Sequence, residues 1–362
     1  MASSGLLLSA LTAYNGAVLD VRKLIFNTIV DPERLRNVAT IMPNQHNGDK
    51  LGLVGEFGLV GKKATGCSPE YDTDTIGVTE KTWDIQPWAI NEQLCYADLE
   101  GTLVQYLLNE KTDISKLDEG EVYRQYIAGV IYPRLRTAIE KMLVRFAWFG
   151  DKNAATVTDG GVLKNGVNPA YFNLINGFWV QLAAIYTADA TKRVTVAANA
   201  EASYAAQRTA ILAAGVATGI MDRLIMSASP ALRGASNKVI YTTLALKDAL
   251  DYDIRNNNKG SELQWQSIFA GIQETTYNGI TLRAVPLFDE IIQTYEGNGT
   301  AWNNPYRAVF TTEDNLLVGI GAGDEIADVQ IHYDPVTELN DIKAKDKVGA
   351  LVRQDNLVVV AI

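Results

Sequence analysis

One long stretch, residues 120–150, constrains the fold of this chain more than any other part of the sequence. Its apolar residues recur at gaps of three and four, which places them on one side of a helix. They are Val122, Tyr126, Ile127, Val130, Ile131, Leu135, Ile139, Met142, Leu143 and Phe146. The charged residues of the opposite side are Arg134, Arg136, Glu140, Lys141 and Arg145. At ~1.5 Å per residue the helix would be roughly 45 Å long. We expect Gly150 to end it in the left-handed conformation.

The charge balance and the scarcity of metal-binding residues exclude several functions. The chain of 362 residues has a formal net charge of −10, which argues against broad binding to phosphate backbones. Cys67, Cys95, His46 and His332 are too scattered for a zinc site or a disulfide framework, so we expect synthesis in a reducing cytoplasm. No apolar run approaches the ~20 residues that span a bilayer, and no membrane partner is expected.

Residues 42–86 form a glycine-rich segment that differs from the compact sequence after it. Two extended runs, residues 51–60 and 76–85, flank a polar middle that contains glycine, so the segment is predicted to be a long β-hairpin. Because such a hairpin has few large side chains to bury, we expect it to project from the body.

The remaining sequence mixes helices with antiparallel strands, which is typical of the α+β class. Helical spacing recurs at residues 171–186 and 202–227, with Gly215 and Gly219 as weak points in the second helix. Asn278-Gly279 lies between two strand-like runs and predicts a tight hairpin. The later predicted strands are residues 306–311, 316–320, 326–333, 341–352 and 357–362.

No motif for catalysis or cofactor binding has its required context. Residues 319–323 (GIGAG) resemble a dinucleotide loop, but a predicted strand follows where that loop must begin a helix. Residues 61–63 (GKK) lack the spacing and the Ser or Thr of a phosphate loop. Asp248, Asp251 and Asp253 have the irregular spacing of a solvated face. We therefore expect no catalytic, cofactor-binding or metal-ligating residues, and no cofactor.

Three segments carry a resemblance to a known family. The end of the chain, ADVQIHYDPVTELNDIKAKDKVGALVRQDNLVVV, has a strand, a turn, a charged strand and a short apolar strand. The other two are GFWVQLAAIY at residues 177–186 and LRAVPLFDE at residues 282–290. Together with the order of the elements, they resemble the major capsid proteins of tailed bacteriophages, which have the Hong Kong-phage capsid fold.

The resemblance implies a fold with an N-terminal arm, an extended hairpin called the E-loop, a P-domain and an A-domain. The arm would be residues 1–41, the E-loop residues 42–86 and the P-domain residues 87–164, with a spine helix at 120–150. The A-domain would be residues 165–324. Residues 325–362 would return to P-domain strands, with the last strand in the P-domain or the A-domain. The residues expected at the E-loop tip, in contact with neighbouring subunits, are Phe57, Lys62 and Lys63. Those expected in the core of the spine helix are Val130, Leu135, Ile139, Leu143 and Phe146.

The function implied by the resemblance is self-assembly rather than catalysis. Copies of the chain would form hexamers and pentamers of an icosahedral shell around the double-stranded DNA genome of a tailed phage. DNA would be enclosed without sequence-specific binding. Further partners would be a portal protein and scaffolding or decoration proteins. The protein would be located in the virion after assembly in the bacterial host cytoplasm.

Two alternatives stay open from the sequence. The first is the shell protein of an encapsulin nanocompartment, which has the same fold but carries a cargo-docking N-terminal helix that residues 1–40 match poorly. The second, from another class, is a soluble NAD-linked enzyme that uses residues 319–323. Failure to bind any nucleotide in a thermal-shift screen would exclude the enzyme.

Overall fold

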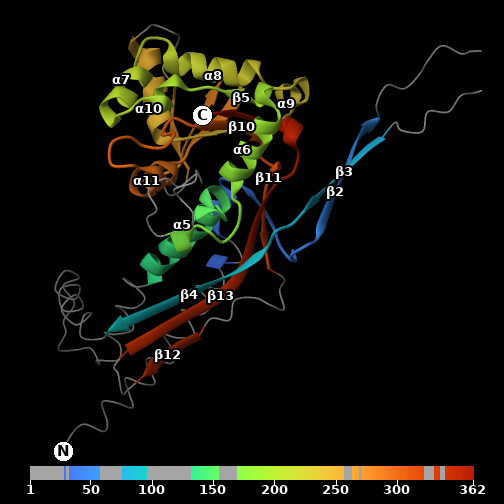
Figure 1. Cartoon of the computed structure of the whole chain (residues 1–362), viewed down its shortest axis with the longest axis vertical. Helices are drawn as coiled ribbons and strands as arrows, with labels where there is room; N and C mark the ends of the chain where they lie inside the picture. Colours follow the sequence, from blue (N-terminus) through green and yellow to red (C-terminus); the bar gives the residue numbers. More distant parts are fainter. Residues whose placement is uncertain are drawn as a thin grey trace, which may run out of the picture.

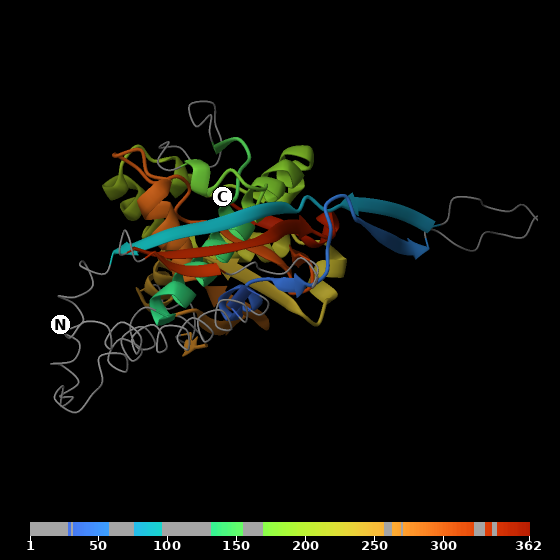
Figure 2. The same ribbon diagram turned by 90° about the horizontal axis from the view of Figure 1, so that it is seen from below.

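The structure, a computed structural model, describes residues 28–29, 32–57, 76–95, 132–154, 169–256, 263–268, 271–321, 330–334 and 339–362. It has an α+β fold, as predicted, with three parts (Figure 1). Helices surround a seven-stranded sheet in a lobe, a five-stranded sheet extends beside the lobe, and a two-stranded hairpin projects away from both. Seen from below, the hairpin continues roughly in the direction of the longest strands (Figure 2).

The long helix α5 (Tyr132–Phe149) lies between the lobe and the five-stranded sheet. Ile139, Leu143 and Phe146 are buried in the main hydrophobic core, and Leu135 packs against that core. Residues 120–131 of the predicted helix, with Val130, lie outside the described residues.

Gly150 follows α5 for a different reason than the one predicted. Its φ is not in the left-handed region. A Cβ at Gly150 would instead lie 2.5 Å from the Phe146 carbonyl oxygen and 2.6 Å from the Ile175 carbonyl oxygen. The Gly177 amide also donates a hydrogen bond of 2.8 Å to the Gly150 carbonyl. Glycine is needed here because two backbone segments approach each other closely.

The short helix α2 (Glu33–Arg36) covers Glu140 on the polar side of α5, which the helical spacing did not anticipate. Glu140 is buried and accepts hydrogen bonds from Arg34 Nε at 3.1 Å and Arg136 Nε at 3.0 Å. Arg136 also reaches Glu33 at 3.0 Å. Glu33 and Arg34 both belong to α2, so these charges attach α2 to α5.

The seven-stranded sheet of the lobe separates two hydrophobic cores. Its spatial order is β5 (Arg193–Val194), β14 (Val359–Ala361), β10 (Ala308–Thr312), β6 (Lys238–Thr242), β9 (Ile280–Ala284), β8 (Gln273–Tyr277) and β7 (Gln266–Ser267). Alternate side chains of a strand point to opposite faces. Accordingly Val239 and Tyr241 enter one core, and Ile240 enters the other.

Each core is closed by its own set of helices. One set is α5, α6 (Phe178–Ala188) and α11 (Pro286–Tyr295), and the other is α7 (Tyr204–Ile211), α8 (Val216–Met226) and α10 (Leu244–Asn256). The remaining short elements are α9 (Pro230–Gly234) and 3₁₀ turns at Pro169–Tyr171, Ala190–Lys192, Ala197–Ala200 and Asp355–Leu357.

Two local predictions in the lobe are confirmed. Strands β8 and β9 form an antiparallel hairpin, and Asn278 and Gly279 take φ values of 49° and 74° in its turn. The helix predicted at residues 202–227 is broken at Gly215, which has a φ of 78°, whereas α8 continues through Gly219. Among the described residues no single helix is long and apolar enough to cross a membrane. Helices α7 and α8 meet that test only as a pair bent by 71°, and α8 is largely buried against the sheet.

The five-stranded sheet is built around the long strand β13 (Leu339–Val352). Strand β4 (Gln86–Cys95) pairs with β13 from Leu339 to Val348, and the other edge of β13 carries β12 (Gln330–Asp334) and β11 (Leu316–Ile320). Strand β1 (Thr40–Met42) adds to β11 in parallel. Strand β11 lies within the span expected to be A-domain, but it pairs here rather than in the lobe. The last strand, β14, pairs in the lobe, which is one of the two placements left open.

Two of the passages of the chain between the two sheets run side by side, and the buried residue Asn315 holds them together. One passage joins β10 to β11, and the other joins β13 to β14. Asn315 Nδ2 donates to the Gln354 carbonyl and to Thr311 Oγ1, both at 3.0 Å. Its Oδ1 accepts from the Gln354 amide at 2.7 Å.

Candidate functional site

The projecting hairpin has an apolar pair on its outer surface. Strands β2 (Lys50–Phe57) and β3 (Ile76–Thr82) are antiparallel, with an irregular register after Val54. Val54 and Val78 face each other across the strands and are 72% and 64% exposed. Leu53, on the opposite face, is buried. The described part of this chain therefore leaves one face of the hairpin uncovered.

The base of the hairpin crosses the five-stranded sheet at a pair of glycines. Gly319 of β11 and Gly349 of β13 are register partners, and the segment Trp83–Asp84–Ile85 passes over them. A Cβ at Gly349 would lie 2.7 Å from Ile85 Cγ1 and 2.8 Å from the Asp84 carbonyl oxygen. A Cβ at Gly319 would lie 3.0 Å from the Trp83 ring. The two glycines thus make room for the connection between β3 and β4.

This crossing has a small hydrophobic cluster of its own, separate from the two cores of the lobe. Its members are Trp83, Ile85, Leu317 and Leu351, with Met42 and Leu51 packed against them. Leu51 belongs to β2 and Met42 to β1, so the cluster joins the hairpin to the sheet. Burial of these side chains fixes where the hairpin leaves the body.

Backbone hydrogen bonds close the hairpin below its last strand pair. The Trp83 amide donates to the Asp49 carbonyl at 2.8 Å, and the Gly48 amide donates to the Trp83 carbonyl at 2.9 Å. Gly48 has a φ of 87°, which suits the turn needed there. The Ile85 amide donates to Asn47 Oδ1 at 3.2 Å.

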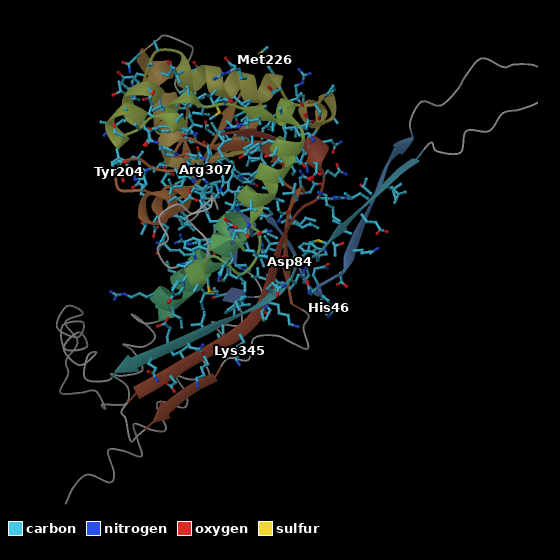
Figure 3. The ribbon with its side chains drawn as sticks, viewed as in Figure 1. His46, Asp84, Tyr204, Met226, Arg307 and Lys345 are labelled. Atoms are coloured by element: carbon cyan, nitrogen blue, oxygen red, sulfur yellow. The ribbon has the colours of Figure 1, made fainter. Side chains whose placement is uncertain are left out.

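Two ion pairs attach the hairpin base to other parts of the chain. Asp84 lies 2.5 Å from Lys152 Nζ and accepts a hydrogen bond of 2.8 Å from Gln86, and Figure 3 places Asp84 at this base. Partial burial raises the pKa of Asp84, but the hydrogen bonds from Gln86 and Lys152 and the Lys152 charge outweigh it, so the pKa lies below the usual value. Lys81 of β3 reaches Asp355 at 2.7 Å. The hairpin is therefore attached to the body at several points.

The predicted tip residues lie at or beyond the end of the described hairpin. Phe57 is the last residue of β2, and its Cα is paired with that of Ile76. Lys62 and Lys63 lie outside the described residues.

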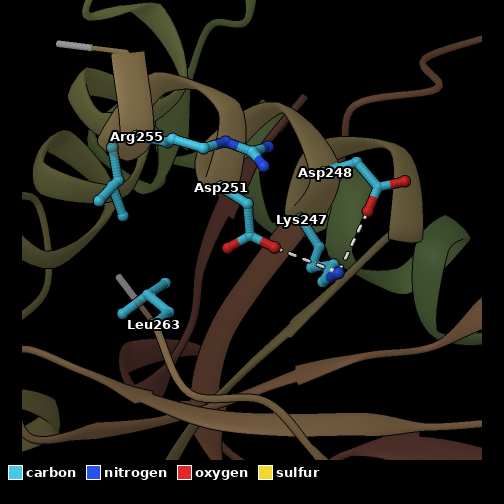
Figure 4. A pocket seen from close by; sticks show the side chains of 6 residues that line it. Lys247, Asp248, Asp251, Arg255 and Leu263 are labelled. Atoms are coloured by element: carbon cyan, nitrogen blue, oxygen red, sulfur yellow. Dashed lines mark hydrogen bonds and ion pairs between the residues drawn. The ribbon is translucent and has the colours of Figure 1, made fainter. Parts of the chain in front are cut away.

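Two features of the described residues bear on a catalytic role, namely metal-binding clusters and cavities. Among them, no group of three or more His, Cys, Asp or Glu could hold a metal ion. A cavity of about 400 Å³ lies beside α10 and is lined by Lys247, Asp248 and Asp251 (Figure 4). Lys247 Nζ lies 3.2 Å from Asp248, 3.1 Å from Asp251 and 5.0 Å from the centre of the Trp265 ring. Arg255 also lines the cavity, so its two cationic and two anionic side chains balance in charge.

Sequence reasoning missed the crossing at the base of the hairpin. From the sequence, Gly319 was interpreted only as part of the glycine run at residues 319–323, and Gly349 only as part of the segment that ends the chain. The available signal was a glycine in each of two predicted strands, because glycine inside a strand often marks a close approach of another backbone. The pairing of the two strands was needed to use that signal.

Comparison with known proteins supports a fold assignment. No family model and no curated protein matches the sequence. A chain in the structure of Gordonia phage Cozz superposes with a TM-score of 0.50 at 12% identity, over 90% of this chain and 84% of that one. A chain from the satellite phage P4 procapsid including size determination (Sid) protein has a TM-score of 0.48 at 11% identity, over 94% and 98%. A chain from the capsid of an empty GTA particle has a TM-score of 0.46 at 13% identity, over 91% and 88%.

At these identities the likeness concerns the fold alone. The chain has the major capsid fold of tailed phages, as the order of its elements predicted.

Proposed function

We propose that this protein is a major capsid protein that assembles with copies of itself into the icosahedral shell of a tailed phage. The observation that carries the proposal is the projecting hairpin β2–β3, which is attached at its base and exposes Val54 and Val78. An exposed apolar pair on an extended element gains buried area when a neighbouring subunit covers it. Many such weak contacts, repeated around a closed shell, become stable together.

In this proposal the parts of the fold take the roles that the resemblance implies. Residues 1–41 are the arm, and the hairpin within residues 42–86 is the E-loop with Phe57, Lys62 and Lys63 near its tip. Helix α5 is the spine, the five-stranded sheet belongs to the P-domain, and the seven-stranded sheet forms the A-domain. Hexamers and pentamers of the subunit enclose double-stranded DNA without sequence-specific binding. A portal protein and scaffolding or decoration proteins complete the virion.

Electron microscopy of the purified protein tests the proposal. At high concentration, with or without a scaffolding protein, we expect closed shells or capsomers in negative stain. The double variant Val54→Glu/Val78→Glu should keep the wild-type melting temperature, because both side chains are exposed, but should form no shells. Thr79→Glu is the control, because Thr79 is an exposed hairpin residue on the face opposite Val54 and Val78.

Two results would contradict the proposal at different levels. A wild-type protein that stays strictly monomeric under all these conditions would argue against a shell protein. If the double variant forms shells as readily as the wild type, the exposed pair of the hairpin is not needed for assembly. The proposal that the protein forms shells would then still stand.

A further inference from the structure

The outer face of the five-stranded sheet carries a row of lysines. Side chains of β13 alternate between its two faces. Ile342 and Ala344 are buried toward α5 and the main core, whereas Lys343 and Lys345 are exposed on the other face. Figure 3 labels Lys345 on this sheet. Lys347 continues the same row at the next alternate position. Among the described residues, neither Lys343 nor Lys345 has an ion-pair partner.

The residues beside this row are small or uncharged. The β4 partners of Lys343, Lys345 and Lys347 are Asn91, Ala89 and Pro87, all three of them exposed. No carboxylate of β4 stands opposite Lys343 or Lys345, so β4 does not neutralise the charges of these two lysines. Asp341, two residues before Lys343 on β13, ends the row of lysines.

We propose that this face, with its exposed Lys343 and Lys345, docks an extended acidic segment of a partner protein. Alternate residues of an extended strand are about 6.8 Å apart, so an extended segment with carboxylates at alternate positions matches the spacing of the row. Among the described side chains of β13 and β4, no large apolar one is exposed on this face, although the core of an interface with a folded domain would need such side chains. An extended acidic segment needs only the complementary charges.

The charge of the whole chain favours an acidic peptide over a nucleic acid. The positive charge is confined to this row of lysines, whereas the whole chain has a net charge of −10. Duplex DNA carries a dense line of phosphates and would meet this overall repulsion along its length. A short segment with only a few carboxylates is repelled much less by the net negative charge of the chain. The docking surface goes beyond the proposed function and belongs to each single subunit.

Fluorescence anisotropy on dispersed subunits at low salt tests the proposal. The probe is a fluorescein-labelled decapeptide of alternating glutamate and serine, and we expect its affinity to fall as salt is raised. The variant Lys343→Gln/Lys345→Gln should weaken binding about tenfold, the product of two roughly threefold losses. Arg223→Gln/Arg233→Gln removes the same charge from two exposed arginines of α8 and α9 and should leave the affinity within about twofold.

Three results would overturn the proposal. The first is no binding of the peptide at low salt, and the second is an equal loss of affinity in both double variants. The third is tighter binding of a 20-base-pair duplex that is lost in the Lys343→Gln/Lys345→Gln variant, which would assign the face to nucleic acid. Shell formation is scored separately by electron microscopy, so a failure here is distinguishable from a failure of the proposed function.

Discussion

Gly349 illustrates how a missing side chain positions a large element. The path of the hairpin base over the sheet exists only because no Cβ stands between Gly349 and the backbone of Asp84. By contrast, a Cβ at Gly52, in strand β2 of the hairpin, would have no neighbouring heavy atom within 4 Å. The same residue type therefore has a structural role at one position and little at the other.

We predict that Gly349→Ala lowers the free energy of unfolding by about 1–3 kcal/mol, because the new methyl group overpacks against Ile85 and a backbone carbonyl. Gly52→Ala should change it by less than about 0.5 kcal/mol. Denaturant unfolding of both variants measures the difference. Equal stability of the two variants would show that the crossing accommodates the new methyl group without strain.

At the residue scale, the sequence predicts local periodicity better than contacts between distant segments. The spacing that assigned Ile139, Leu143 and Phe146 to a core is a property of one helix, and all three are buried. Glu140 was assigned to the exposed side by the same spacing. It is buried because α2, more than a hundred positions earlier in the chain, covers it. No local pattern contains that information.

Arg307 is the point where several elements of the lobe are tied together. It is fully buried and forms an ion pair with Glu296, which follows α11. Its guanidinium lies 5.5 Å from the centre of the Phe149 ring at the end of α5 and 5.2 Å from that of Trp179 in α6. One side chain thus contacts three helices around the main core.

We predict that Arg307→Met destabilises the protein by about 3–5 kcal/mol, because it removes the cation that faces a buried carboxylate. The double variant Arg307→Met/Glu296→Gln should recover part of that loss, since the carboxylate is then gone as well. A double-mutant cycle by chemical denaturation measures the coupling. Strictly additive effects of the two substitutions would mean that the pair contributes no mutual stabilisation.

At the element scale, most strands and helices were predictable, but their pairing was not. The β8–β9 hairpin follows from Asn278-Gly279, because its partners are adjacent in sequence and its turn has specific residue requirements. Strand β11 was predicted as a strand, yet its place beside β13 depends on a partner that comes later in the chain. The base of the candidate site, formed by β11, β13 and the β3–β4 connection, was missed for the same reason.

For the whole molecule, stability should depend on the protonation of Asp289. This buried residue of α11 accepts hydrogen bonds from the amides of Leu244 at 2.5 Å and Ala245 at 2.9 Å, at the start of α10. Burial raises the pKa of Asp289 to about 6, although the backbone hydrogen bonds act in the opposite direction. The folded protein therefore binds this proton more tightly than the unfolded chain does.

The contribution of Asp289 to stability is complete below about pH 4, where both states hold the proton, and is lost as the pH rises to about 6. We predict that the wild type loses on the order of 3 kcal/mol relative to Asp289→Asn between pH 4 and pH 7. Unfolding curves of both proteins at several pH values give that difference. A difference that stays constant with pH would contradict the prediction.

Asn315 gives the junction of the two sheets a mechanical property. The two passages of chain between the sheets run together, and one buried amide group bridges them. A pull on the long sheet therefore reaches the lobe through these two covalent strands together, besides the connection from β4 to β5. Shear at this junction must stretch both strands at once, because Asn315 ties one to the other.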